Sequence, residues 1–276
     1  MNIADITPGH CHARAQRLVA ELELVREEMG RTKDARPLPE LTNAAPREAY
    51  FGAIAAWHKA TRLSDDVGIR VGRPAPSSPA LKDIVPGHVH QLIDAVLLQV
   101  EDVVQMFGIT AKVPEASVDA SRTPGDVLAV LTHANRTLSS MLERPFTPSD
   151  VYRIIALATA YASRLTNKHV ELAPFERNRK PSDCYERLES VLASVGKLIA
   201  KRGGTALAAH GTLGQVAPSD VYDLAQVVLG EVAFLHGLTS SAAAVQAFEP
   251  HGEGHRLPAH CHQLIRTLDA QLASLA

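Results

Sequence analysis

The chain has 276 residues, a formal net charge of −2, and a composition that is 46% hydrophobic but only 4% aromatic. Both signs of charge are spread along the sequence, and no basic stripe of the kind that binds nucleic acid is present. No apolar run reaches the ~18 residues that a membrane span needs, and the N-terminus shows no signal peptide. We therefore expect a cytoplasmic protein with no nucleic-acid face and no membrane span.

Eight segments read as helices that each begin at a proline. Proline suits the first helical position, because its ring fixes φ and its missing N–H would have no partner there. Two residues after each proline stands Asp, Glu or His, and four residues after it stands a planar ring in seven segments, Leu128 being the exception. An acid in this first turn can close a capping box and complement the helix dipole. In chain order the prolines are Pro8, Pro46, Pro86, Pro124, Pro148, Pro181, Pro218 and Pro258.

The same apolar register follows every one of these prolines. The residues three, seven, ten, fourteen and seventeen positions after each proline are all apolar, which makes forty positions in eight segments. This spacing keeps them on one face of a helix and matches the seam of a left-handed bundle. In the first segment these seam positions are Cys11, Ala15, Leu18, Leu22 and Val25.

We accordingly expect an all-α protein, with eight helices as four helix-pair repeats, arranged as two fused four-helix bundles or as one continuous helical array. Residues 1–144 would form the first four-helix set and residues 145–276 the second, tightly packed on the first because the link between them is short. Most other linkers run 14–22 residues, which is long for helix–helix connections. Such a linker can stretch ~45 Å at ~3.3 Å per residue. The sequence therefore allows two arrangements. The helices could alternate in an up-down-up-down order, or crossover linkers could make consecutive helices parallel.

Standard catalytic and cofactor motifs are absent from the sequence. There is no Walker phosphate loop, Gly-x-Gly-x-x-Gly, His-Glu-x-x-His, Gly-x-Ser-x-Gly or Cys-x-x-Cys. The seam holds no carboxylate and no histidine, which argues against a ferritin-like di-metal centre. The segment 132–138 faintly resembles the phospho-accepting box of histidine kinases, but the acid after His133 is missing. Histidine phosphotransfer is therefore a remote alternative, and we interpret His133 as a surface residue.

Histidine is the one chemically suggestive residue type, because eight of its thirteen copies lie at helix starts or in the segment 251–262. A protonated imidazole at a helix N-terminus meets the positive end of the dipole, whereas a neutral imidazole bound to a metal avoids this conflict. The alternative interpretation, which needs no metal, is that His replaces Asp, Glu or Tyr at half-buried positions. Parallel first and third helices would gather the first four candidates at one end. The candidate ligands for Zn²⁺ or Cu²⁺ are His10, His12, His88, His90, His251, His255, His260 and His262.

The three cysteines each occupy the first seam position of a helix, where other segments carry Val or Ala. We interpret Cys11, Cys184 and Cys261 as small buried hydrophobes with free thiols, which suits a reducing compartment.

The sequence favours a non-catalytic helical scaffold or protein-interaction module. Such a module would bind a protein partner or a second copy of the chain. The alternative is a protein that binds a metal or a small ligand through histidines at helix N-termini. The scaffold predicts an exposed apolar patch, and the binding protein predicts bound metal or a polar pocket at a bundle end.

Overall fold

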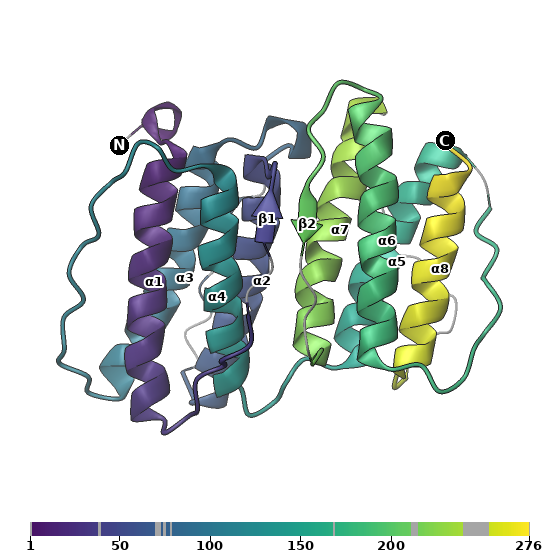
Figure 1. The fold of residues 1–276 in the computed structure, drawn as a ribbon. Coiled ribbons are helices and arrows are strands. Elements are labelled where there is room, and N and C mark those ends of the chain that lie inside the picture. Colours follow the sequence, from purple (N-terminus) through teal and green to yellow (C-terminus); the bar gives the residue numbers. More distant parts are fainter. Residues whose placement is uncertain are drawn as a thin grey trace. The chain divides into compact units, whose positions relative to one another are not determined.

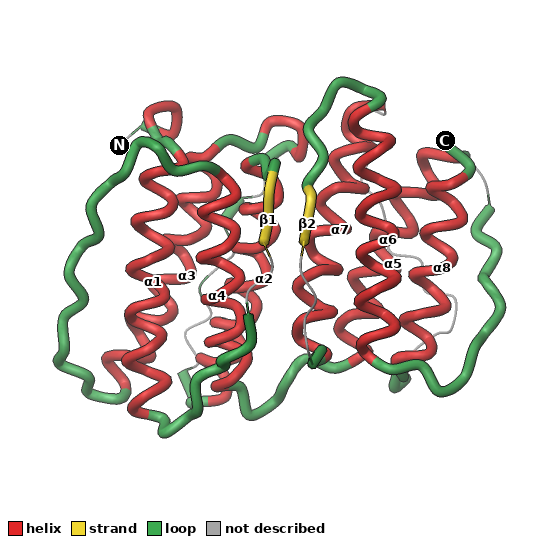
Figure 2. Tube along the Cα trace, in the orientation of Figure 1, coloured by secondary structure: helices red, strands yellow, loops and turns green. Residues whose placement is uncertain are grey.

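The computed structural model of the chain describes residues 2–37, 40–69, 73, 76–77, 79–167, 169–210, 215–239 and 254–275. The predicted all-α class is confirmed, and each predicted helix begins at its proline. Two three-residue strands and one 3₁₀ turn lie in the linkers, and a further 3₁₀ turn precedes the first helix (Figure 2). The elements are η1 (Ile3–Asp5), α1 (Pro8–Glu28), β1 (Glu40–Thr42), α2 (Pro46–Asp66), η2 (Leu81–Asp83), α3 (Pro86–Met106), α4 (Pro124–Met141), α5 (Pro148–Thr166), α6 (Pro181–Ala200), β2 (Ala208–His210), α7 (Pro218–Thr239) and α8 (Pro258–Ala273).

The apolar seam of each helix forms the core. All forty seam positions are buried except Leu165 and Leu275, which are half-buried and hold the last position of the register; Leu275 lies two residues beyond the end of α8. Residues such as Leu18 and Leu131 have no exposed surface at all. The 4-3-4-3 spacing produces this result because it returns every seam residue to the same side of its helix.

The chain divides between Pro145 and Phe146 into two compact units, one built from α1–α4 and the other from α5–α8. In the first unit α1 and α2 each pack against both α3 and α4, which closes a ring in the order α1, α3, α2, α4 (Figure 1). The second unit has the equivalent ring α5, α7, α6, α8. The first two helices of each unit therefore lie across the ring from one another, and so do the last two, which the long linkers between them permit.

All four helices of each unit run in the same direction. In the first unit the opening prolines of α1–α4 meet around a single small pocket, so the four N-termini lie at one end. The prolines of α5–α8 meet in the same way. The crossover connection is thus the one adopted, and an up-down-up-down order is wrong for this chain. Parallel packing is possible because a long linker can return along the outside of the bundle, as residues 107–123 do between α3 and α4 (Figure 1).

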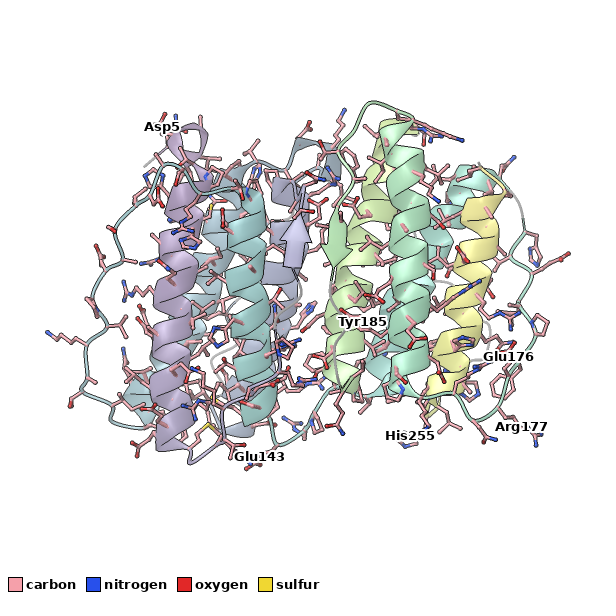
Figure 3. All side chains as sticks on the ribbon, viewed as in Figure 1. Asp5, Glu143, Glu176, Arg177, Tyr185 and His255 are labelled. Carbon is pink, nitrogen blue, oxygen red and sulfur yellow. The ribbon has the colours of Figure 1, made fainter. Side chains whose placement is uncertain are left out.

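The returning linkers are held by helix side chains. Ahead of α2, the carbonyl oxygens of Arg36 and Pro37 accept hydrogen bonds from Arg136 of α4, at 3.0 and 2.8 Å. Ahead of α6, the carbonyl oxygen of Ala173 accepts one from Gln263 of α8 at 2.7 Å. On this same linker Glu176 accepts a hydrogen bond from an α8 arginine and lies at the outer side of α8 (Figure 3). These contacts satisfy backbone groups that a linker cannot pair with itself.

Among the described helices, α7 alone is long and apolar enough to cross a membrane by length and composition. In the structure 72% of that apolar stretch is buried inside the protein. A core helix of a bundle has the same composition, and α7 occupies such a core position between α5 and α6.

Candidate functional site

The side chain two positions after each proline accepts a hydrogen bond from the backbone N–H of the residue before that proline, which is one half of a capping box. In α2 the carboxylate of Glu48 accepts the N–H of Ala45 at 2.7 Å, and aspartates do the same in α4, α5, α6 and α7. In the three remaining helices a histidine takes this role through Nδ1. The bonds join Thr7 N to His10 at 3.2 Å, Val85 N to His88 at 3.2 Å, and Leu257 N to His260 at 3.0 Å.

This geometry defines the state of the three capping imidazoles. A backbone N–H can only donate, so Nδ1 of His10, His88 and His260 must be the unprotonated acceptor. A neutral ring accepts this bond without opposing the positive end of the helix dipole. The conflict that suggested a metal is therefore relieved by the helix's own N–H, and His here substitutes for Asp or Glu.

In α1, α5 and α8 the planar ring four residues after the proline lies close to an arginine of the segment that leads into a neighbouring helix. The guanidinium of Arg256, two residues before α8, stands 4.8 Å above the ring of Tyr152 on α5. His12 on α1 holds the equivalent position and is only 7% exposed. Burial lowers the pKa of His12, and the charge of Arg122, two residues before α4, lowers it further.

His262 on α8 repeats this arrangement with the segment that leads into α6. It is 8% exposed, and its pKa is lowered by burial and then by the charge of Arg179, two residues before α6. Glu176 lies 3.8 Å from its Nδ1 and acts in the opposite direction. The matching environments of His12 and His262 show that an arginine two residues before a helix and the buried ring of the adjacent helix form one structural unit.

The three cysteines are buried thiols at the helix starts, as predicted. Each donates a hydrogen bond to the opening proline carbonyl of the next helix in its ring. The sulfur–oxygen distances are 3.1 Å from Cys11 to Pro86, 3.3 Å from Cys184 to Pro258 and 3.1 Å from Cys261 to Pro148. Burial raises the pKa of Cys11 and Cys184 to about 12 and raises that of Cys261 as well. Such thiols are weak nucleophiles.

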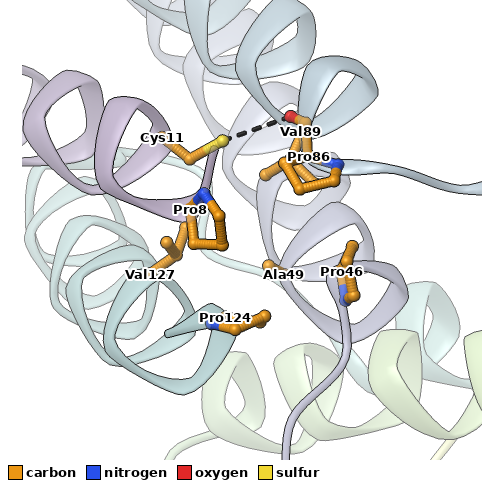
Figure 4. Close-up of a pocket in the computed structure, with 8 residues that line it drawn as sticks. All are labelled: Pro8, Cys11, Pro46, Ala49, Pro86, Val89, Pro124 and Val127. Carbon is orange, nitrogen blue, oxygen red and sulfur yellow. Dashed lines mark hydrogen bonds between the residues drawn. The ribbon is translucent and has the colours of Figure 1, made fainter. Parts of the chain in front are cut away.

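The pocket at the N-terminal end of each unit is too small for an organic ligand. Its volume is about 10 Å³ in both units, room for a single water at most. In the first unit it is lined by the opening prolines and by the first seam residues Cys11, Ala49, Val89 and Val127 (Figure 4). Apart from the cysteine thiols, which donate to proline carbonyls, these walls are apolar.

The candidate ligands of the first unit share one end without forming a cluster. His10 and His88 cap their helices, His12 is buried, and Nδ1 of His90 lies 3.1 Å from Oδ2 of Asp94. Among the residues that the structure describes, no three His, Cys, Asp or Glu side chains are grouped so that they could hold a metal ion.

The candidates of the second unit are likewise dispersed. His260 caps α8 and His262 is buried beneath the segment before α6. His255 is exposed ahead of α8 (Figure 3), and His251 lies outside the described residues. The histidine metal site stays a prediction.

Exposed apolar side chains gather at the N-terminal ends, a feature that we did not derive from the sequence. Val85 (41% exposed) and Val118 (51%) stand at the starts of α3 and α1, and Leu257 (59%) and Phe175 (45%) stand at the start of α8. We call these two pairs the N-terminal rims. A sequence signal exists, since Val85 and Leu257 directly precede a helix proline and Val118 and Phe175 stand six residues before one.

Comparison with known proteins gives no relative from which a function could be transferred. No protein-family model matches the chain, and neither a curated protein nor a solved structure matches it.

Proposed function

We propose that this chain is a non-catalytic helical scaffold that associates with a second copy of itself through its N-terminal rims. The observation that carries the proposal is the position of the exposed large apolar side chains. Of the seven in the described part of the chain, four belong to the rims, and in both units they stand one and six residues before a helix proline. Exposed large apolar side chains that gather on a surface are typical of protein interaction sites.

A second copy suits these rims better than a charged partner. Phe175 and Leu257 both stand at the start of α8, where the rings of Phe175 and His260 lie 5.1 Å apart. In a two-fold dimer the same rim from each copy meets itself, so apolar side chains on the rim are self-complementary.

The roles of the repeated polar residues support a non-catalytic function. The capping histidines are engaged by helix N–H groups, and the cysteine thiols are buried against proline carbonyls. These side chains serve helix initiation and helix packing, as the acids, tyrosines and valines do in the equivalent positions of other helices.

Sedimentation velocity of the full chain over a range of concentrations tests the proposal. We expect reversible dimerisation that the double substitution Phe175→Ser/Leu257→Ser weakens, because it removes apolar contact from the rim. Val85→Ser/Val118→Ser shows whether the first unit also contributes. Leu98→Ser is the matched control, since Leu98 is 43% exposed on α3 but lies away from the rims. A chain that stays monomeric at every concentration, or a control that weakens association as much, would contradict the proposal.

A further inference from the structure

A pocket lies away from the rims, between α1, α3 and the linker that leads to α4. Its volume is about 310 Å³, at the lower end of the range for small-molecule sites. Its charged lining comes from all three segments and consists of Arg17 and Glu21 of α1, Glu101 of α3 and Lys112 of the linker. Positive and negative side chains are therefore equal in number, and the formal charge of the lining is zero.

The uncharged lining of this pocket is mostly aliphatic. Leu24 of α1, Val104 of α3 and Val113 of the linker are all half-buried, and Gln105 and Ala111 complete the lining. Ligand pockets typically combine such apolar walls with a few polar groups that fix the orientation of the ligand. An aliphatic surface beside charges of both signs suits a ligand that has an aliphatic part and two opposite charges.

The two carboxylates of the pocket differ in accessibility. Arg17 Nε donates to Oε1 of Glu21 at 2.8 Å, and a terminal nitrogen of the same guanidinium donates to Oε1 of Glu101 at 2.8 Å. The Glu21 side chain is only 9% exposed, whereas the Glu101 side chain is 31% exposed. Glu101 is therefore the carboxylate that a ligand can reach, and its second oxygen can accept a further hydrogen bond.

The positive side chains of the pocket have donors that the protein's own carboxylates do not use. Nη1 of Arg17 stands 3.9 Å from Oε1 of Glu115, which is too far for a hydrogen bond. Lys112 is exposed, and its ammonium group has no carboxylate partner within the described part of the chain. Such donors form short, strong hydrogen bonds with a carboxylate, so they can hold the acidic group of a ligand.

We propose that this pocket binds an aliphatic α-amino acid in its zwitterionic form. The carboxylate of the ligand pairs with Lys112 and Arg17, and its ammonium group pairs with Glu101. The aliphatic side chain of the ligand contacts Leu24 and Val113. A ligand with a single charge would leave one of these groups unmatched, whereas a zwitterion matches a lining of zero formal charge. The pocket contains none of the rim residues, so this inference does not depend on self-association.

Isothermal titration calorimetry of the full chain with L-leucine tests the inference. Glycine, 3-methylbutylamine and 4-methylpentanoate are the comparison probes, because they lack the alkyl group, the carboxylate and the ammonium group of leucine, respectively. We expect saturable binding of leucine and binding at least about tenfold weaker for each comparison probe, the effect of losing one charged or apolar contact.

Lys112→Gln removes the positive charge that pairs with the carboxylate and should weaken leucine by about tenfold or more. Lys82→Gln is the matched control, because Lys82 is also exposed but lies in η2, outside the pocket. The control should leave leucine affinity unchanged, and circular dichroism confirms that both variants are folded. Absence of saturable leucine binding, equal weakening by the two substitutions, or binding of 3-methylbutylamine as tight as that of leucine would overturn the inference.

Discussion

The thiol of Cys11 donates a hydrogen bond to the carbonyl oxygen of Pro86, 3.1 Å away, and so joins the first turn of α1 to the first residue of α3. The bond is possible only where two helix N-termini lie side by side (Figure 4). Two further cysteines make the same bond in the second unit. These three hydrogen bonds therefore require that the helices they join run in the same direction.

The buried cysteines should resist thiol reagents in the folded protein. Because burial raises the pKa of Cys11 and Cys184 to about 12, almost no thiolate is present at neutral pH, and the thiolate is the reactive form. Labelling with a chromogenic disulfide reagent should be slow in buffer and complete in urea. Rapid labelling of all three thiols without denaturant would contradict the assigned burial.

The imidazole of His88 should stabilise the protein as a helix cap. His88→Ala removes the acceptor for the N–H of Val85 and should lower the free energy of unfolding by about 0.5–1 kcal/mol, since this N–H lies near solvent. His88→Gln should cost less, because Gln can close the same capping box. Urea denaturation measures both variants. If the two lose stability equally, and a chelator reproduces the loss in the unaltered chain, His88 is a metal ligand rather than a cap.

The seam leucines should carry much of the stability. Leu22 and Leu268 have no exposed surface, so Leu22→Ala or Leu268→Ala should each cost roughly 2–5 kcal/mol. Glu27 has a 68% exposed side chain, and Glu27→Ala should change the free energy of unfolding by less than about 0.5 kcal/mol. Thermal and chemical unfolding of the three variants provide the comparison. Similar small effects in all of them would mean that the seam is not the core.

Acid should destabilise the protein through His12 and His262. Both have a folded-state pKa below the value of about 6.5 of an unfolded chain, so the unfolded chain binds protons more readily. The stabilisation is complete above pH ~6.5 and is lost as the pH falls from there toward the folded-state values. Unfolding free energies measured across this range in the unaltered chain and in His12→Tyr/His262→Tyr give the contribution by difference.

Tyrosine is the appropriate replacement in this experiment, because it occupies the same position in four other helices. The double variant should show a flatter dependence of stability on pH. An unchanged slope would show that other groups cause the acid sensitivity.

The sequence was sufficient to predict features that depend on residues within one helix. The start of α3 at Pro86 follows from the fixed φ of proline, and the burial of Val89 and Ile93 follows from their spacing. The cap formed by His88 was not recognised, because a dipole argument considered the protonated ring and overlooked Nδ1 as an acceptor. The equivalence with Glu48 and Asp126 was the available signal.

The tertiary structure alone decided the direction of the helices, the order of the ring and the neighbours of each histidine. A long linker can reach either end of a bundle, and its closure entropy changes too slowly with length to choose between them. The choice depends on where the linker packs. At Gly9 a Cβ would overlap the carbonyl oxygen of Asp119, and at Gly87 it would overlap that of Ile3. Both of these contacts arise because a segment outside the helices approaches a helix that is distant in the chain. The pattern of apolar residues within one helix cannot predict such a contact, because the two residues that meet, such as Gly9 and Asp119, are distant in the chain.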